Sequence, residues 1–249
     1  MKRMTVLRWM AAASVVLVAV AVLAAAEDGT DASASGMLDP LLTEGYAPQR
    51  VETATFALGC FWGPDARLGM LRGVLRTRVG YSGGTTLHPS YYDIDGHAES
   101  VQVDFDPSII SYARLLEAFW AAHDPLREPR TPQYRSVIFY HSEEQRAAAE
   151  ASALAHEEDR GAPPHTEIVP FERFTRAEDF HQKYWLLGSD LVYEMQDRFG
   201  SFREFVDSTV AARLNGYVAG WGTVDRLEAE LEALALSEDG ETYLRDLYR

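Results

Sequence analysis

The chain has 249 residues, of which 47% are hydrophobic and 24% are charged, and this is the composition of an ordinary globular protein. Its formal net charge of −15 argues against a nucleic-acid partner and against electrostatic adhesion to anionic lipid, because both call for a basic surface. Such acidity is typical of a soluble surface that repels other copies of itself.

The N-terminus departs from this composition. Lys2, Arg3 and Arg8 precede an apolar stretch, residues 9–26, that ends in three alanines. A basic start, an apolar middle and a small-residue end are typical of a secretory signal peptide. We therefore expect residues 1–26 to be a signal peptide or, alternatively, an N-terminal membrane anchor. Either predicts an exported protein, periplasmic or extracellular.

A flexible linker is predicted next, over residues 27–50, which are rich in Asp, Ser, Gly and Thr. The pattern then predicts a buried strand over residues 53–58 and a helix over residues 61–71. Alternating apolar residues predict two further strands, over residues 74–81 and 100–105.

Further helices and strands are predicted in the second half of this region. Helices are predicted from Ser111 to Ala122, from Ser142 onward through an alanine-rich stretch, and from Ala177 to Leu187. Strands are predicted over residues 136–140 and 166–170. The order β-α-β-β-α-β-α-β contains two split β-α-β units, which predicts an α/β fold, an α+β two-layer sandwich with a ferredoxin-like core.

Residues 51–190 are accordingly predicted to form one catalytic domain. Residues 191–249 are expected to be a helical C-terminal extension that packs on this core, because Leu227, Leu231 and Leu234 share one helical face.

The chain holds a single cysteine, Cys60, which rules out a disulfide within these 249 residues. A lone cysteine in an exported protein suggests a reactive thiol or an intermolecular link, whereas a buried, inert cysteine is the alternative. Cys60 falls where a strand ends and a helix begins. Unpaired N–H groups at a helix start stabilise a thiolate, so we expect a lowered Cys60 pKa and a nucleophilic role.

Two other clusters carry candidate chemistry. Glu99, in Gly-His-Ala-Glu, is a candidate general acid if it is buried, because desolvation raises a carboxyl pKa; a solvated loop glutamate is the alternative. The His-x-Glu spacing also occurs in zinc deaminases, but their two-cysteine motif is absent, so no metal site is predicted. Tyr91 and Tyr134 are candidate hydrogen-bond donors to a polar oxygen, or ordinary packing residues. Phe61 and Trp62 could wall an apolar pocket or belong to the core.

Taken in order, four motifs resemble the A-class peptide methionine sulfoxide reductases, over about residues 51–190. They are Gly-Cys-Phe-Trp-Gly at 59–63, Gly-Tyr-Ser-Gly-Gly at 80–84, Gly-His-Ala-Glu at 96–99 and Gln-Tyr-Arg-Ser at 133–136. The resemblance implies an enzyme that reduces methionine-S-sulfoxide in proteins, in peptides and as the free amino acid, and so repairs oxidised proteins.

The resemblance also assigns roles to individual residues. It implies that Cys60 attacks the sulfoxide sulfur and becomes a sulfenic acid, and that Glu99 donates a proton to the sulfoxide oxygen. It implies that Tyr91 and Tyr134 hydrogen-bond that oxygen. Phe61 and Trp62 would form the pocket for the methyl group.

The sequence departs from the family pattern in three places. The segment from Tyr91 to His97 is short and has no cysteine, and Pro129 stands where the family usually has an aspartate. Resolving cysteines near the C-terminus are absent. We therefore expect no bound cofactor and recycling by an external thiol, thioredoxin-like, glutaredoxin-like or small. A thiol peroxidase and a non-catalytic module that binds methionine or its sulfoxide remain alternative interpretations.

Overall fold

The computed structural model describes residues 38–249 apart from residue 197. The chain divides into two compact units, residues 1–33 and residues 34–249, and all described residues lie in the second. The predicted signal peptide or anchor therefore lies outside the described residues. No helix within residues 38–196 or 198–249 is both long enough and apolar enough to span a membrane.

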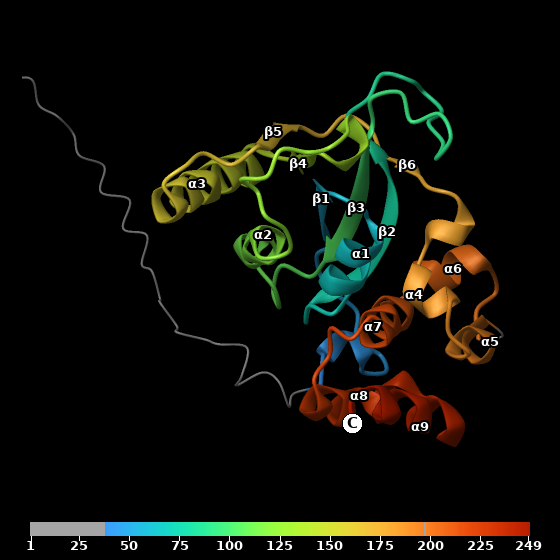
Figure 1. Cartoon of the computed structure of the whole chain (residues 1–249). Helices are drawn as coiled ribbons and strands as arrows, with labels where there is room; N and C mark the ends of the chain where they lie inside the picture. The colour runs from blue at the N-terminus through green and yellow to red at the C-terminus, as the bar shows by residue number, and fades with distance from the viewer. Residues whose placement is uncertain (1–37, 197) are drawn as a thin grey trace, which may run out of the picture. The chain divides into compact units, whose positions relative to one another are not determined.

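Within the described residues, one six-stranded sheet has the order β5-β4-β1-β3-β2-β6 (Figure 1). The strands are β1 (Glu52–Leu58), β2 (Val74–Ser82), β3 (Ala98–Phe105), β4 (Ser136–Tyr140), β5 (Thr166–Pro170) and β6 (Thr175–Arg176). Neighbouring strands pair antiparallel except β4 and β5, which are parallel. The inner order β4-β1-β3-β2 is that of a ferredoxin-like sheet, so the predicted fold class is confirmed.

Helices α1 (Trp62–Gly69), α2 (Tyr112–Trp120) and α3 (Glu143–Arg160) cover one face of this sheet. Alternation along β1 explains the choice of face: Ala54, Phe56 and Leu58 point into the apolar layer beneath the helices. Ser111 and Ser142 cap α2 and α3 through their side-chain oxygens, as predicted.

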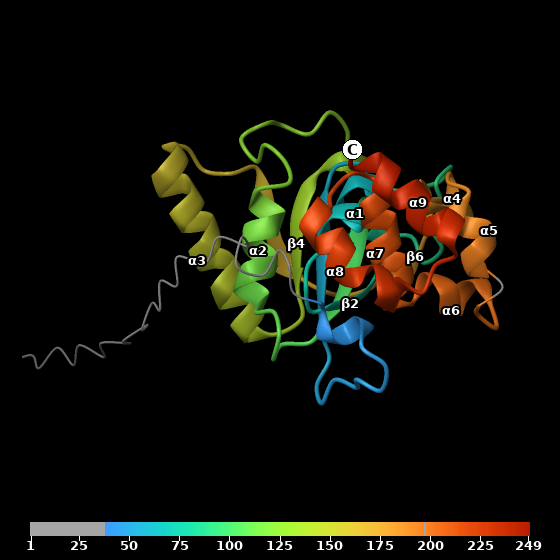
Figure 2. The same cartoon turned by 90° about the horizontal axis from the view of Figure 1, so that it is seen from below.

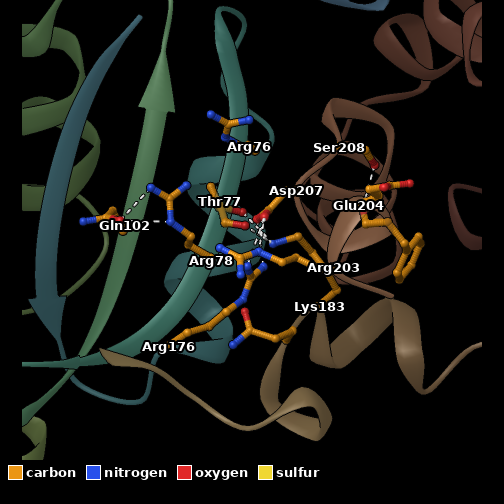
Figure 3. A network of polar contacts seen from close by, with 12 residues as sticks. Arg76, Thr77, Arg78, Gln102, Arg176, Lys183, Arg203, Glu204, Asp207 and Ser208 are labelled. Carbon is orange, nitrogen blue, oxygen red and sulfur yellow. Dashed lines mark hydrogen bonds and ion pairs between the residues drawn. The ribbon is translucent and has the colours of Figure 1, made fainter. Parts of the chain in front are cut away.

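The opposite face of the sheet carries a polar network (Figure 3). Arg78 donates hydrogen bonds to Gln102 and to Asp104, and Gln102 donates in turn to Thr55 of β1. Because Asp104 is almost fully buried, these bonds replace the water that its carboxylate loses. The network ties three adjacent strands together on the face that the first three helices leave uncovered.

The C-terminal part is helical, as predicted. It consists of α4 (Tyr184–Leu187), α5 (Leu191–Gln196), α6 (Phe202–Val206), α7 (Thr209–Val218), α8 (Val224–Leu234) and α9 (Glu238–Leu247). Helix α7 packs beside α1 in both views (Figures 1 and 2). At the edge of the sheet, Arg176 of β6 donates two hydrogen bonds to Asp207, at the end of α6, at 2.8 and 3.0 Å.

Buried ionic groups join α1 to the C-terminal part. Lys183 and Asp65 are both fully buried, and the Lys183 Nζ lies 2.8 Å from the Asp65 Oδ1. The other oxygen of this carboxylate accepts a hydrogen bond from the Asn215 side chain of α7. A buried charge is stable when it is paired and hydrogen-bonded, as both are here. Lys183 and Asn215, both distant in sequence, therefore hold α1, the helix that follows Cys60.

The flexible linker predicted over residues 27–50 is wrong for its later part. Residues Pro40–Leu42 form a 3-10 turn, η2, capped by Asp39. The buried carboxylate of Asp39 accepts hydrogen bonds from the backbone N–H of Gly73 and, at 2.6 Å, from Arg213 of α7. Composition suggested flexibility, but a single buried acid paired with a buried arginine fixes this segment to the core.

The helix predicted from Ala177 to Leu187 is also wrong. A 3-10 turn, η4 (Asp179–His181), and the short α4 replace it, and the strand β6 just before it was not predicted. Lys183, between the two turns, has a φ of 50°, which a continuous helix does not allow. Gln182 bonds the backbone of Val79 through both its amide atoms. These tertiary bonds override the local periodicity.

Candidate active site

Cys60 lies in the turn between β1 and α1 and is exposed. Gly59, just before it, has a φ of +97°, which glycine adopts without strain, so the strand can turn sharply into the helix. The backbone N–H of Trp62, in the first turn of α1, donates a hydrogen bond to the Cys60 sulfur and by itself lowers the thiol pKa. The predicted position of the thiol at a helix start is thus the position in the structure.

The predicted net shift of the Cys60 pKa is wrong, however. Burial of the sulfur among neighbouring groups raises the pKa of the Cys60 thiol above its usual value, and this outweighs the bond from Trp62. The negative charge of Glu99 raises the pKa further. The free protein therefore keeps Cys60 as a thiol, and anything that neutralises Glu99 favours the thiolate.

Glu99 stands at the start of β3 and is 2% exposed. Its carboxylate accepts hydrogen bonds from the backbone N–H of Phe61 at 3.1 Å and from the Gln133 side chain at 2.6 Å. Burial raises the Glu99 pKa above its usual value, and the two hydrogen bonds offset this only in part. A carboxyl that stays protonated to higher pH is suited to donate a proton.

Tyr134 ends the 3-10 turn η3 (Pro132–Tyr134) and is exposed at the same site. Burial raises the pKa of its hydroxyl, and the negative charge of Glu99 raises it further. Tyr134 lines a cavity beside Cys60, and the Tyr91 ring lies against His181, which packs on Phe61. The structure therefore brings together the four residues that the sequence suggested for the nucleophile, the acid and the two hydroxyl donors.

The two aromatic candidates occupy different environments. Phe61 is 1% exposed and packs in an apolar cluster with Val79, Tyr81 and Ala177, so its ring is largely core. Trp62 is partly exposed and stacks flat on Tyr184, with ring centroids 3.6 Å apart. Of the pair, Trp62 presents the more accessible apolar surface beside Cys60.

Three further residues support the site and were not predicted as part of it. Gln133 donates to Glu99 and lies within a motif that was already visible in the sequence. Glu178 accepts a hydrogen bond from the Tyr81 hydroxyl at 2.8 Å and another from the Tyr91 backbone N–H at 3.0 Å, so it holds the Tyr91 loop on β2. His181 had no sequence signal, since its segment was interpreted as a plain helix.

His181 is buried among the aromatic rings of the site. Its ring centroid lies 5.2 Å from that of Phe61 and 4.9 Å from that of Tyr91. The Trp62 indole N–H donates to its Nδ1 at 3.3 Å. Burial lowers the His181 pKa. A neutral imidazole is therefore favoured here, and it can accept the indole hydrogen bond that orients Trp62.

Arg135 joins the loops around the site. Its guanidinium donates hydrogen bonds to the backbone oxygens of Gly83, Gly96 and Pro132. These carbonyls belong to three segments that are separate in sequence, including the two glycine-containing motifs before and after Tyr91. The arginine of the Gln-Tyr-Arg-Ser motif thus fixes loops rather than contacting the reacting groups.

A cavity of about 610 Å³ opens beside Cys60. Tyr134 lines it, together with residues 127–130 of the loop that departs from the family pattern. The other lining residues are Leu58, Gly59, His123, Asp124 and Ser136. Within the described part of the chain, no group of three or more His, Cys, Asp or Glu side chains is placed to hold a metal ion.

Comparisons with known proteins show which family the chain resembles. Residues 52–213 match the family described as peptide methionine sulfoxide reductase, and residues 202–242 match the helical domain of selenoprotein methionine sulfoxide reductase A. A peptide methionine sulfoxide reductase of Drosophila melanogaster is 44% identical over 195 residues, which cover 77% of this chain and 78% of that protein. A relative of the same description from Methanosarcina mazei is 50% identical over 147 residues, covering 54% and 69%.

Solved structures point the same way. Mxr1 from Saccharomyces cerevisiae in reduced form superposes with a TM-score of 0.53 at 28% identity, covering 58% of this chain and 88% of that one. Methionine sulfoxide reductase A of Corynebacterium diphtheriae gives a TM-score of 0.50 at 29% identity, covering 58% and 78%. Since the family match spans the whole sheet, Cys60 and Glu99, and a relative is similar over more than three quarters of both chains, this chain belongs to the peptide methionine sulfoxide reductase family.

Proposed function

We propose that this protein reduces methionine-S-sulfoxide to methionine, in proteins, in peptides and as the free amino acid, through a sulfenic acid on Cys60. The observation that carries the proposal is the meeting of an exposed thiol with a buried carboxyl whose pKa is raised. Sulfoxide reduction needs both, because a nucleophile must attack sulfur while the oxygen receives protons.

The reaction balances with groups that the site holds. The Cys60 sulfur bonds to the sulfoxide sulfur as Glu99 gives its proton to the sulfoxide oxygen. The bond between the two sulfurs and the sulfur–oxygen bond of the substrate then break as the oxygen passes with its new proton to Cys60, which leaves a cysteine sulfenic acid and the thioether of methionine. The proton that Glu99 donates is balanced by the one that Cys60 loses when it becomes a thiolate. Cysteine is oxidised by two electrons and the sulfoxide is reduced by two.

The surrounding side chains are assigned to binding. Tyr134 and Tyr91 donate hydrogen bonds to the sulfoxide oxygen, since Tyr134 lines the cavity beside Cys60 and the Tyr91 ring lies against His181 of the same site. Trp62, with Phe61 behind it, receives the methyl group in an apolar environment.

Recycling requires a thiol from outside these 249 residues, because Cys60 is their sole cysteine. The outside thiol attacks the sulfenic acid to give a mixed disulfide and water, and a second thiol then releases Cys60 by exchange. A thioredoxin-like or glutaredoxin-like protein, or a small thiol, supplies both electrons. The exposure of Cys60 supports this, since a partner sulfur must reach it in line.

We propose further that the protein acts outside the cytoplasm, in the periplasm or the extracellular space, where it repairs oxidised proteins. The support is the basic, apolar and small-residue pattern of residues 1–26, which directs export as a signal peptide or retains the chain as an anchor through residues 9–26.

Turnover tests the proposal directly. With excess dithiothreitol, we expect a peptide that carries the S-sulfoxide to be converted to the methionine peptide, and a peptide that carries the R-sulfoxide to stay unchanged. A thiol peroxidase would instead consume hydrogen peroxide faster than the sulfoxide, and a binding module would bind the peptide without converting it. Either result would contradict the proposed function.

A further inference from the structure

Exposed aromatic rings border the candidate active site. Tyr92 is 88% exposed, Phe180 is 56% exposed and Trp185 is 42% exposed. Single apolar residues are common on protein surfaces, but here three large exposed rings each lie beside a residue of the same site. We call these three residues the aromatic rim.

Each ring of the rim touches a residue of the inner site. Tyr92 packs edge-on against Tyr91 at 5.5 Å between centroids, and Phe180 lies against His181 at 4.3 Å. Trp185 packs edge-on against Tyr184, the ring on which Trp62 is stacked, at 5.7 Å. The rim is therefore continuous with the apolar wall beside Cys60.

A second border of Cys60 is the cavity described above. Its lining includes the side chains of Asp124, Arg127, Glu128 and Arg130, although most of the surface it exposes is apolar. A polypeptide whose methionine sulfoxide reaches Cys60 must lay its neighbouring side chains on these borders. Apolar neighbours lose water favourably where they cover the exposed rings of the aromatic rim.

We propose that the aromatic rim binds apolar or aromatic side chains next to methionine sulfoxide in an extended polypeptide. The inference rests on the proposed function, which puts the oxidised methionine at Cys60. Methionines flanked by apolar residues are usually buried in folded proteins. The preferred substrates are therefore unfolded or damaged chains in which such segments are exposed.

Two blocked peptides test the proposal, one with Leu and Phe around a single methionine-S-sulfoxide and one with Ser at the same positions. We expect kcat/KM to favour the apolar peptide by about three- to tenfold, the effect of one or two aromatic contacts. The double variant Tyr92→Ala/Phe180→Ala should reduce this ratio to near one. The control Leu154→Ala, which removes an exposed apolar residue from α3, should leave the ratio unchanged.

A ratio near one in the unaltered protein, or an unchanged ratio in the double variant, would overturn the proposal. Binding of both peptides to Cys60→Ser, measured by calorimetry, separates this result from a failure of the proposed function, because the Kd ratio reports the rim without any chemistry. The aromatic rim could instead be covered by a second copy of this chain, and light scattering over a range of concentrations tests this. A dimer that the double variant abolishes would assign the rim to that contact and overturn its role in substrate binding.

Discussion

The carboxylate of Glu99 accepts a hydrogen bond from the backbone N–H of Phe61, the residue that directly follows Cys60, at 3.1 Å. This bond joins β3 to the turn that carries the thiol. It fixes the distance between acid and nucleophile, and it makes each group sensitive to the charge of the other. The pH dependence of catalysis and the reactivity of the Cys60 thiol both depend on this coupling.

Replacing the nucleophile should abolish catalysis. We expect Cys60→Ser to give no measurable reduction of methionine sulfoxide, because a serine hydroxyl stays protonated at neutral pH and cannot form a sulfenic acid. Unfolding temperature should change little, since Cys60 is exposed. Appreciable turnover by this variant, measured as methionine release, would remove Cys60 from the mechanism.

Replacing the acid should lower turnover and simplify its pH dependence. We expect Glu99→Gln to lower kcat/KM by at least about tenfold, a cautious bound because a general acid typically contributes about a hundredfold or more. The reactive form needs a proton on Glu99 and none on Cys60, so the unaltered protein should show a bell-shaped profile with the apparent pKa values of the pair. The pH profile of the Glu99→Gln variant should keep a single transition, which reports the ionisation of Cys60. A profile with both limbs intact would contradict the assignment.

The same substitution should make the thiol more reactive. The charge of Glu99 raises the pKa of Cys60, so removing that charge should lower this pKa and increase the thiolate fraction at neutral pH. Alkylation by iodoacetamide, followed as a function of pH by mass spectrometry, measures the shift. Glu150→Gln, on the exposed face of α3, is the matched control and should not change the rate. An equal rate in all three proteins would show that the two groups are not coupled.

The oxidised intermediate should be trappable. Without reductant, we expect one equivalent of substrate to yield one methionine per protein and a dimedone adduct on the Cys60 peptide, detected by mass spectrometry. Adding a small thiol should convert the sulfenic acid to a mixed disulfide that more thiol resolves. A concentration-dependent disulfide dimer on a non-reducing gel, with no adduct, would contradict the cycle.

Acid should weaken the attachment of α6 to the sheet. Burial alone would raise the Asp207 pKa, but the hydrogen bonds and charge of Arg176 outweigh it and hold the pKa below its usual value. The ion pair therefore adds stability above the unfolded-state pKa, about 4, and loses it as pH falls through the lower folded-state pKa. We expect Asp207→Asn to lower Tm by about 2–4 °C per kcal/mol lost at pH 7, and the difference to vanish in acid. A Tm difference independent of pH would contradict this.

The sequence predicted those parts of the fold that short-range patterns determine. Alternation located two of the strands, β2 and β3, and apolar or β-branched runs located β1 and β4. Side-chain caps such as Ser111 and Ser142 located helix starts. It did not predict the break at Lys183 or the ordering of Asp39, because buried partners far away in sequence decide both. Propensity is a weak constraint when tertiary bonds compete with it.

In the candidate site, too, residues in short motifs were predicted and residues that act through distant contacts were not. Cys60 and Glu99 were found because each lies in a short motif whose chemistry is visible in its own residues. Glu178 and His181 were not found, since each acts through a hydrogen bond with a residue about a hundred positions away in the chain, Tyr81 of β2 and Trp62 of α1. The direction of the Cys60 pKa shift also depends on burial, which the sequence does not reveal.

The bond from Asn215 to Asp65 has a consequence for how the helical segment can be altered. The two family matches overlap across residues 202–213, and α7 begins within that overlap. Loss of α7 would leave the carboxylate beneath α1 with one oxygen unsatisfied, at a cost of about 1–3 kcal/mol for a buried group. In this chain the helical segment is thus coupled to α1, and its deletion alone would destabilise the helix that follows the nucleophile. Substitutions at Asp65 and Asn215 are expected to have non-additive effects on stability.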